Sequence, residues 1–130
     1  MKKYGRKTRD IVFFSAKNQT TLCVHTPQAR RYAKLLEEDT RIRSYEVNHP
    51  LDAAWIARID RVGIRGAYLQ TQWTTDFVIT DQDGGEAIRE IVTADLLGKH
   101  AEIEKLELSR RYWKARGIED WRLVLTGEAE

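Results

Sequence analysis

The stretch that decides the fold is residues 73–92, WTTDFVITDQDGGEAIREIV. Residues 76–80 are rich in β-branched and aromatic side chains, which is typical of a β-strand. The segment DQDGG at 81–85 supplies the glycines that a tight turn needs for positive φ angles. Residues 87–92 then form the return strand. We therefore expect a β-hairpin here, with the rest of the chain arranged around it.

This hairpin carries two acidic side chains. Side chains two residues apart share a face of a strand, so Ile88, Glu90 and Val92 point the same way. Asp76 begins the first strand, and its carboxylate can meet that of Glu90 at one end of the sheet. Mg²⁺ typically takes one or two protein carboxylates and fills its other positions with water and phosphate oxygens. Asp76 and Glu90 are therefore candidate metal ligands.

The same residues resemble a nuclease signature. Asp-Phe, a polar hairpin and then Glu-x-Val is similar to the Asp…(Asp/Glu)-x-Lys pattern of the PD-(D/E)xK nucleases. The pattern is most similar to the N-terminal domain of TnsA, the transposase subunit that cuts transposon 5′ ends. TnsA usually reads TPDF and EVKP, whereas this chain reads TTDF at 74–77 and EIVT at 90–93. The resemblance implies that Asp76 and Glu90 are catalytic and bind Mg²⁺, with Val92 at the lysine position.

Other positions of the family pattern also differ here. The family has a metal-binding Glu on its first helix, and the two aligned positions hold His25 and Ala29. His25 is a candidate substitute ligand, with an ordinary surface histidine as the alternative. The catalytic lysine migrates in this superfamily, so Lys99 or Lys105 is a candidate replacement, with solvated surface lysines as the alternative. Losing one transition-state donor typically costs about 10² to 10³ in rate, so the resemblance implies impaired catalysis.

Composition narrows the class of protein. The 130 residues, 42% hydrophobic and 32% charged, are expected to form a single TnsA N-terminal-like domain over residues 1–130. No apolar run approaches the ~18 residues of a membrane span, and no apolar signal segment opens the chain. The lone Cys23 cannot form an internal disulfide, which fits a reducing cytoplasm and no structural zinc.

Charge is distributed unevenly along the chain. Residues 1–65 carry 14 Lys/Arg against 7 Asp/Glu, and residues 66–130 carry 8 against 13. The basic excess is densest in residues 1–10, which we expect to be a flexible arm that contacts DNA phosphates. The alternative is an idle, solvated terminus. The candidate DNA-binding residues of this arm are Lys2, Lys3, Arg6, Lys7 and Arg9.

Capping signals and periodicity predict the elements before the hairpin. Residues 11–14 form a short strand or an anchor on the core, and residues 15–21 form a polar loop. Thr26-Pro27 begins a helix that runs to about residue 39. Residues 42–47 alternate as a strand. Residues 52–60 fit either a helical turn or a strand, and the family resemblance favours the strand.

After the hairpin, residues 100–116 form the clearest helix, ended by Gly117 as a C-cap glycine. Residues 121–125 are the last strand. The helix face toward the core is expected to follow the spacing of Ile103, Leu106, Arg110 and Trp113. The four tryptophans are expected to serve the core, with a DNA groove as the alternative for Trp73.

A strand–helix–strand return implies a parallel crossover, so the fold class is α/β with a mixed sheet flanked by helices. This order matches the restriction-endonuclease-like core that the resemblance implies. The function expected from it is a TnsA-like, catalytically impaired DNA-binding subunit of a transposition or mobile-element system, partnered by DNA and other transposase subunits. The alternative is an active Mg²⁺-dependent endonuclease that cuts transposon ends with a migrated lysine.

Overall fold

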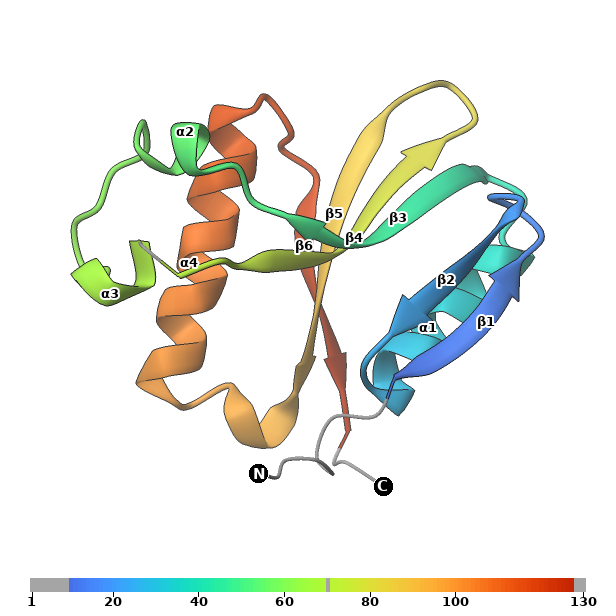
Figure 1. The fold of residues 1–130 in the computed structure, drawn as a ribbon, viewed down its shortest axis with the longest axis horizontal. Helices are drawn as coiled ribbons and strands as arrows, with labels where there is room; N and C mark the ends of the chain where they lie inside the picture. Colours follow the sequence, from blue (N-terminus) through green and yellow to red (C-terminus); the bar gives the residue numbers. More distant parts are fainter. Residues whose placement is uncertain (1–9, 70, 128–130) are drawn as a thin grey trace.

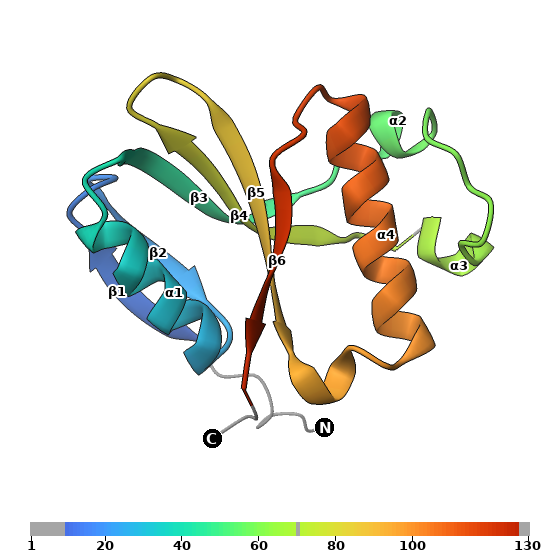
Figure 2. The ribbon, with the colours of Figure 1, turned by 180° about the vertical axis from the view of Figure 1, so that it is seen from behind.

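The computed structural model describes residues 10–69 and 71–127, and it has a central sheet with other elements on both faces (Figures 1 and 2). In chain order the elements are β1 (Ile11–Ser15), β2 (Thr20–Val24), α1 (Pro27–Glu38), β3 (Ile42–Pro50), α2 (Ala53–Ile56), α3 (Gly66–Leu69), β4 (Thr74–Asp81), β5 (Glu86–Thr93), a 3₁₀ turn η2 (Ala94–Leu96), α4 (His100–Ala115) and β6 (Trp121–Thr126).

The central sheet has four strands in the order β3-β4-β5-β6, and β1 pairs with β2 in a separate hairpin. β4 is antiparallel to both β3 and β5, whereas β5 and β6 are parallel. The chain passes from β5 to β6 through α4, which is the crossover that a parallel pair requires. The prediction of a mixed sheet flanked by helices is therefore confirmed.

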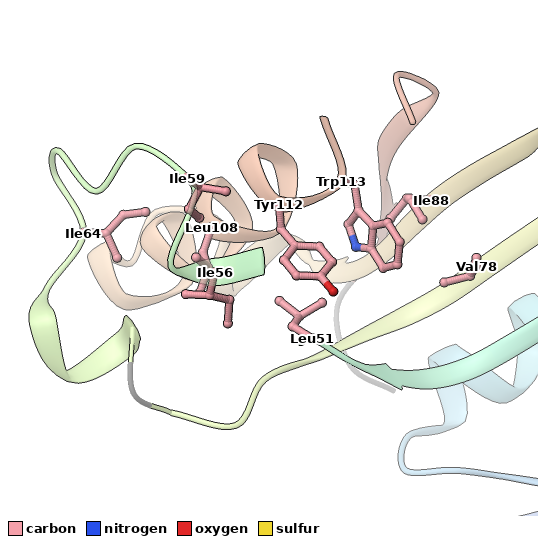
Figure 3. Close-up of a cluster of buried hydrophobic side chains, with 9 residues drawn as sticks. All are labelled: Leu51, Ile56, Ile59, Ile64, Val78, Ile88, Leu108, Tyr112 and Trp113. Carbon is pink, nitrogen blue, oxygen red and sulfur yellow. The ribbon is translucent and has the colours of Figure 1, made fainter. Parts of the chain in front are cut away.

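The two faces of the sheet bury separate hydrophobic clusters. Helices α2, α3 and α4 lie on one face, and α1 with the β1–β2 hairpin lies on the other (Figures 1 and 2). The cluster under α4, drawn in Figure 3, consists of Leu51, Ile56, Ile59, Ile64, Val78, Ile88, Leu108, Tyr112 and Trp113. The other three tryptophans pack against this cluster, so the expected core role of the tryptophans is confirmed.

Helix α1 begins as its sequence predicts. The Thr26 hydroxyl accepts the backbone N–H of Ala29 at 3.1 Å, and Pro27 occupies the first helical position. This arrangement satisfies one of the unpaired N–H groups at a helix start. The cluster that α1 covers on the second face of the sheet consists of Val24, Ala29, Ala33, Leu36, Tyr45, Phe77 and Ile79.

The C-terminal end of α1 is acidic, which the helix dipole disfavours, and tertiary contacts compensate for it. Glu37 accepts hydrogen bonds from the Ser15 hydroxyl, the backbone N–H of Lys17 (3.1 Å) and the Tyr45 hydroxyl (2.5 Å). Burial would raise the pKa of Glu37, but these hydrogen bonds outweigh it and hold that pKa below its ordinary value. The acidic end therefore fastens β1 and β3 to α1.

Two segments differ from the predictions. Residues 52–60 contain the helix α2 and not a strand, because the Asp52 side chain caps that helix by accepting the N–H of Ala54 at 2.9 Å. Residues 15–21 are only partly a loop, because β2 begins at Thr20 and pairs with β1. The prediction of a strand at 52–60, which was preferred to a helical turn, is therefore wrong. The prediction that the polar loop extends to residue 21 is also wrong.

Helix α4 ends as predicted, with Gly117 at a φ of 90°, but its buried face is shifted around the axis. Ile103 is 48% exposed and Arg110 is exposed. The buried residues of the helix are Leu106, Leu108, Ser109, Tyr112 and Trp113. Among residues 10–69 and 71–127, no helix combines the length and the apolar character that spanning a membrane would take.

Tyr112 links α4 to the start of α2. Its hydroxyl accepts the backbone N–H of Asp52 at 2.9 Å. We expect Tyr112→Phe to lower the free energy of unfolding by about 1–3 kcal/mol, because that N–H loses its acceptor. Urea denaturation measures the change. The matched control is Tyr68→Phe, whose hydroxyl has no hydrogen bond to any described residue; equal losses in the two variants would contradict the prediction.

Candidate functional site

The turn between β4 and β5 fixes the register of the hairpin. The Asp81 carboxylate accepts the backbone N–H groups of Asp83 (2.9 Å) and Gly85 (2.8 Å). Gly84 adopts a φ of 88°, which favours glycine. A Cβ at position 85 would lie 2.9 Å from the Asp81 carboxylate. The predicted turn at 81–85 is confirmed, with Gly84 as its residue of positive φ, whereas the φ of Gly85 is not positive and a side chain there would crowd the Asp81 carboxylate.

This register sets the two candidate acids opposite each other. The β4–β5 ladder ends at the pair Phe77 and Arg89. One further step of the same register would pair Asp76 with Glu90. At that point β4 stays paired with β3, and β5 stays paired with β6, so the two strand pairs diverge (Figure 1). The structure thus brings Asp76 and Glu90 together where the sheet opens.

Side chains replace the backbone acceptors at this opening. The backbone N–H of Asp76 donates to Glu90 Oε1 at 3.0 Å, and the backbone N–H of Ile91 donates to Asp76 Oδ2 at 2.7 Å. Each acid therefore accepts a hydrogen bond from the opposite strand. A buried N–H left without an acceptor costs about 1–3 kcal/mol, so the pair supports the sheet whatever its chemistry.

Helix α4 bridges the opening from one side. The Ser109 hydroxyl donates to Glu90 Oε2 at 2.5 Å, and the Trp121 indole donates to Ser109 Oγ at 2.9 Å. The Trp113 indole donates to the Thr75 hydroxyl at 2.7 Å. None of these contacts was predicted from the sequence. The only sequence feature that indicates them is a serine placed between buried residues of a helix.

The two carboxyl groups form a coupled acid pair. Glu90 is only 3% exposed, and burial, followed by repulsion from Asp76, raises the pKa of Glu90 to about 7. Burial also raises the pKa of Asp76, against the opposing effects of the Ile91 N–H, Lys105 and His25. The pair therefore titrates as a unit.

Two of the proposed replacement residues lie near Asp76. Lys105 reaches over the ring of Trp73, with Nζ 5.8 Å from the ring centre, and its charge lowers the pKa of Asp76. His25, which precedes the N-cap of α1, acts on that pKa in the same direction. Neither residue hydrogen-bonds to the acid pair, and among the described residues no lysine or arginine does.

The remaining sequence-derived positions lie elsewhere. Val92, at the family's lysine position, is 1% exposed and belongs to the interior. Ala29 is buried in the α1-side cluster. Lys99 occupies the N-cap of α4 and forms no ion pair with either acid. The basic arm residues Lys2, Lys3, Arg6, Lys7 and Arg9 lie outside the described residues.

Among the described residues, the acid pair can supply a metal with two carboxylates, and no further His, Cys, Asp or Glu side chain joins them as a third ligand. Within residues 10–69 and 71–127, one group of three or more potential ligand side chains occurs, formed by Asp10, Cys23 and His25. An ion held by Asp76 and Glu90 would therefore take its other ligands from water and from a phosphate. That donor set fits Mg²⁺, which keeps several waters and binds one or two carboxylates.

Comparison with known proteins assigns no family. No protein-family model matches the chain, and no curated protein sequence matches it. The fold and the site define a mixed α/β protein with a buried acid pair at an opening in its sheet.

The raised pKa of Glu90 predicts how stability depends on pH. Between the ordinary value of 4.5 and about 7, the folded protein holds a proton that the unfolded chain has lost. The free energy of unfolding should therefore fall as pH rises through this window, on the order of a few kcal/mol. Urea denaturation in EDTA from pH 4.5 to 8 measures it.

Glu90→Gln should remove most of this pH dependence, because the amide keeps an acceptor for the Asp76 N–H and cannot ionise. Glu86→Gln is the matched control, since Glu86 is an exposed carboxylate at the start of the same strand. It should leave the wild-type profile in place. Parallel profiles for wild type and Glu90→Gln would contradict the raised pKa.

Proposed function

We propose that this protein is a nuclease-fold, TnsA-like DNA-binding subunit of a transposition or mobile-element system, with impaired DNA cleavage. The proposal includes a cytoplasmic location and contacts with other transposase subunits. The observation that carries it is the acid pair at the opening between β4 and β5. The resemblance predicts paired carboxylates on adjacent strands of one hairpin, and Asp76 and Glu90 occupy such positions.

The arrangement of the elements supports a restriction-endonuclease-like core. An antiparallel hairpin carries both acids, and a helix then leads to a parallel strand beside the hairpin. A first helix covers the opposite face of the sheet (Figure 2). Apart from the helix at 53–56, where the resemblance favoured a strand, these elements follow the order that the resemblance implies, which supports the same core.

The proposal of impaired cleavage rests on the surroundings of Glu90. Metal-assisted cleavage uses an ion to lower the pKa of the attacking water and to neutralise charge on the phosphate. Both oxygens of Glu90 already accept hydrogen bonds within the protein, and the side chain is almost fully buried. An ion at the pair must also displace the proton that burial favours. Mg²⁺ binding is therefore expected to be weak.

One observation favours the second candidate, an active Mg²⁺-dependent endonuclease. Lys105, on α4, lies over the ring of Trp73, and its charge favours the charged form of Asp76. In such an enzyme Asp76 and Glu90 would hold Mg²⁺, and Lys105 would take the place of the lysine that Val92 replaces. Its role would be to stabilise the charge that develops on the phosphate. DNA binding is common to both candidates, and cleavage distinguishes them.

Plasmid cleavage separates the two candidates. For the proposed subunit, we expect supercoiled plasmid to stay intact when it is incubated with the protein and Mg²⁺ or Mn²⁺. The nicked fraction should not exceed that in buffer without protein. The physical reason is the near-complete burial of Glu90, which disfavours its charged form, and the absence, among the described residues, of a lysine bonded to the acid pair. Agarose gels quantify the nicked fraction over time.

Nicking by wild type that disappears in Asp76→Ala would overturn impaired cleavage and establish the second candidate. In that case Lys105→Ala should lower the rate by about 10² to 10³ if Lys105 is the replacement cation. Lys114→Ala is the matched control, because Lys114 is an exposed lysine near the other end of α4. Equal rates for the two lysine variants would exclude Lys105.

DNA binding is tested by gel shifts over a salt series. We expect the affinity to fall steeply with salt, because lysines and arginines that contact phosphates release condensed counterions. Replacing the five arm cations by alanine should flatten the plot of log K against log salt by up to about 0.9 for each phosphate that the variant no longer neutralises. The control is Lys34→Ala with Lys114→Ala, two exposed lysines on separate helices. Salt-insensitive affinity would contradict DNA binding by the arm.

A further inference from the structure

The β1–β2 hairpin brings three metal-ligating side chains to one end of its outer face. The register pairs Val12 with Cys23, and the chain continues two residues beyond this pair to Asp10 and His25, whose side chains are in contact. His25 directly follows β2, and its side chain lies close to that of Cys23. The neighbouring Val12 is 63% exposed, which identifies this face as the one turned away from the core.

The ligand atoms of this cluster lie close together. His25 Nδ1 is 3.0 Å from Asp10 Oδ1, and one ligand atom from each of the three residues lies within 4.8 Å of the others. In a tetrahedral zinc site with bonds of about 2.0–2.3 Å, ligand atoms are roughly 3.3 to 3.8 Å apart. The side chains of His25 and Asp10 are 48% and 69% exposed, so they can close onto an ion without repacking the core.

We propose that Asp10, Cys23 and His25 form a zinc site with water at the fourth position. The donor set selects the metal: a thiolate and an imidazole suit Zn²⁺, whereas Mg²⁺ and Ca²⁺ prefer oxygen ligands. Three protein ligands and one open position are typical of a zinc site accessible to solvent. A single cysteine indicates that no zinc site is built from several cysteines, whereas a mixed site with histidine and aspartate needs only one.

The position of this site gives the ion a mechanical role. Asp10 directly follows the basic segment 1–9, and His25 directly precedes Thr26, the N-cap of α1. A bound ion would therefore fasten the residue after that segment to the residue before the helix. The site uses neither Asp76 nor Glu90 and is independent of the proposed function.

Zinc affinity measured on the full, reduced, metal-free chain tests the proposal. Competition with a chromophoric chelator should give one Zn²⁺ per chain. Co²⁺ should give a near-ultraviolet charge-transfer band, because a thiolate ligates it. Removing a group that only supports a ligand costs about 10–100-fold in affinity, so Cys23→Ser should weaken binding by at least about 100-fold. The same variant should lose the cobalt band.

Asp10→Asn should also weaken binding, and it provides a second variant at an exposed residue if Cys23→Ser is destabilised in EDTA. His49→Ala is the matched control, because His49 pairs with Glu46 at 3.1 Å without a thiol nearby. It should bind Zn²⁺ as wild type does. The proposal is overturned if wild type binds no Zn²⁺, if Cys23→Ser and Asp10→Asn bind as tightly as wild type, or if Asp76→Ala abolishes binding while Cys23→Ser retains it.

Discussion

The structure depends on how two carboxyl groups complete a broken β-ladder. At the opening between β4 and β5, the N–H groups of Asp76 and Ile91 find side-chain acceptors and not carbonyl oxygens. This exchange lets the two strand pairs separate without leaving buried donors unpaired. Helix α4 can then enter the space between them, with Ser109 bonded to one strand and Trp113 to the other. The core under α4 forms around these contacts.

The same two groups face opposing demands. Supporting the sheet requires only hydrogen-bond acceptors, and a protonated acid keeps enough acceptor capacity to serve. Holding a divalent ion requires both groups charged, which burial of Glu90 opposes. Lys105 and His25 act against burial by favouring the charged form of Asp76. Whether the pair acts chemically is therefore a balance between desolvation, which opposes the charged form, and the nearby side chains that favour it.

Local signals predicted the centre of the fold well. The glycines at 84 and 85, the alternation of β5 and the Thr26-Pro27 cap each specify a conformation within a few residues, and the meeting of Asp76 and Glu90 follows from that hairpin. Long-range contacts were beyond such signals. Placing Lys105 beside Trp73 requires the packing angle of α4, and placing Asp10 beside His25 requires recognising β2. At 52–60 the helical turn is marked by one residue, the aspartate at position 52 that caps α2.

The dual use of the acid pair also affects how kinship can be judged. In most enzymes an active-site acid is dispensable to the fold, so a lineage that abandons the chemistry soon loses the residue. Here a change of Asp76 or Glu90 to a side chain without an acceptor would leave a backbone N–H of the sheet unpaired, so selection for folding alone favours an acceptor at both positions. The presence of acceptor side chains there in a descendant would therefore reflect the fold and would not show whether the protein cuts DNA.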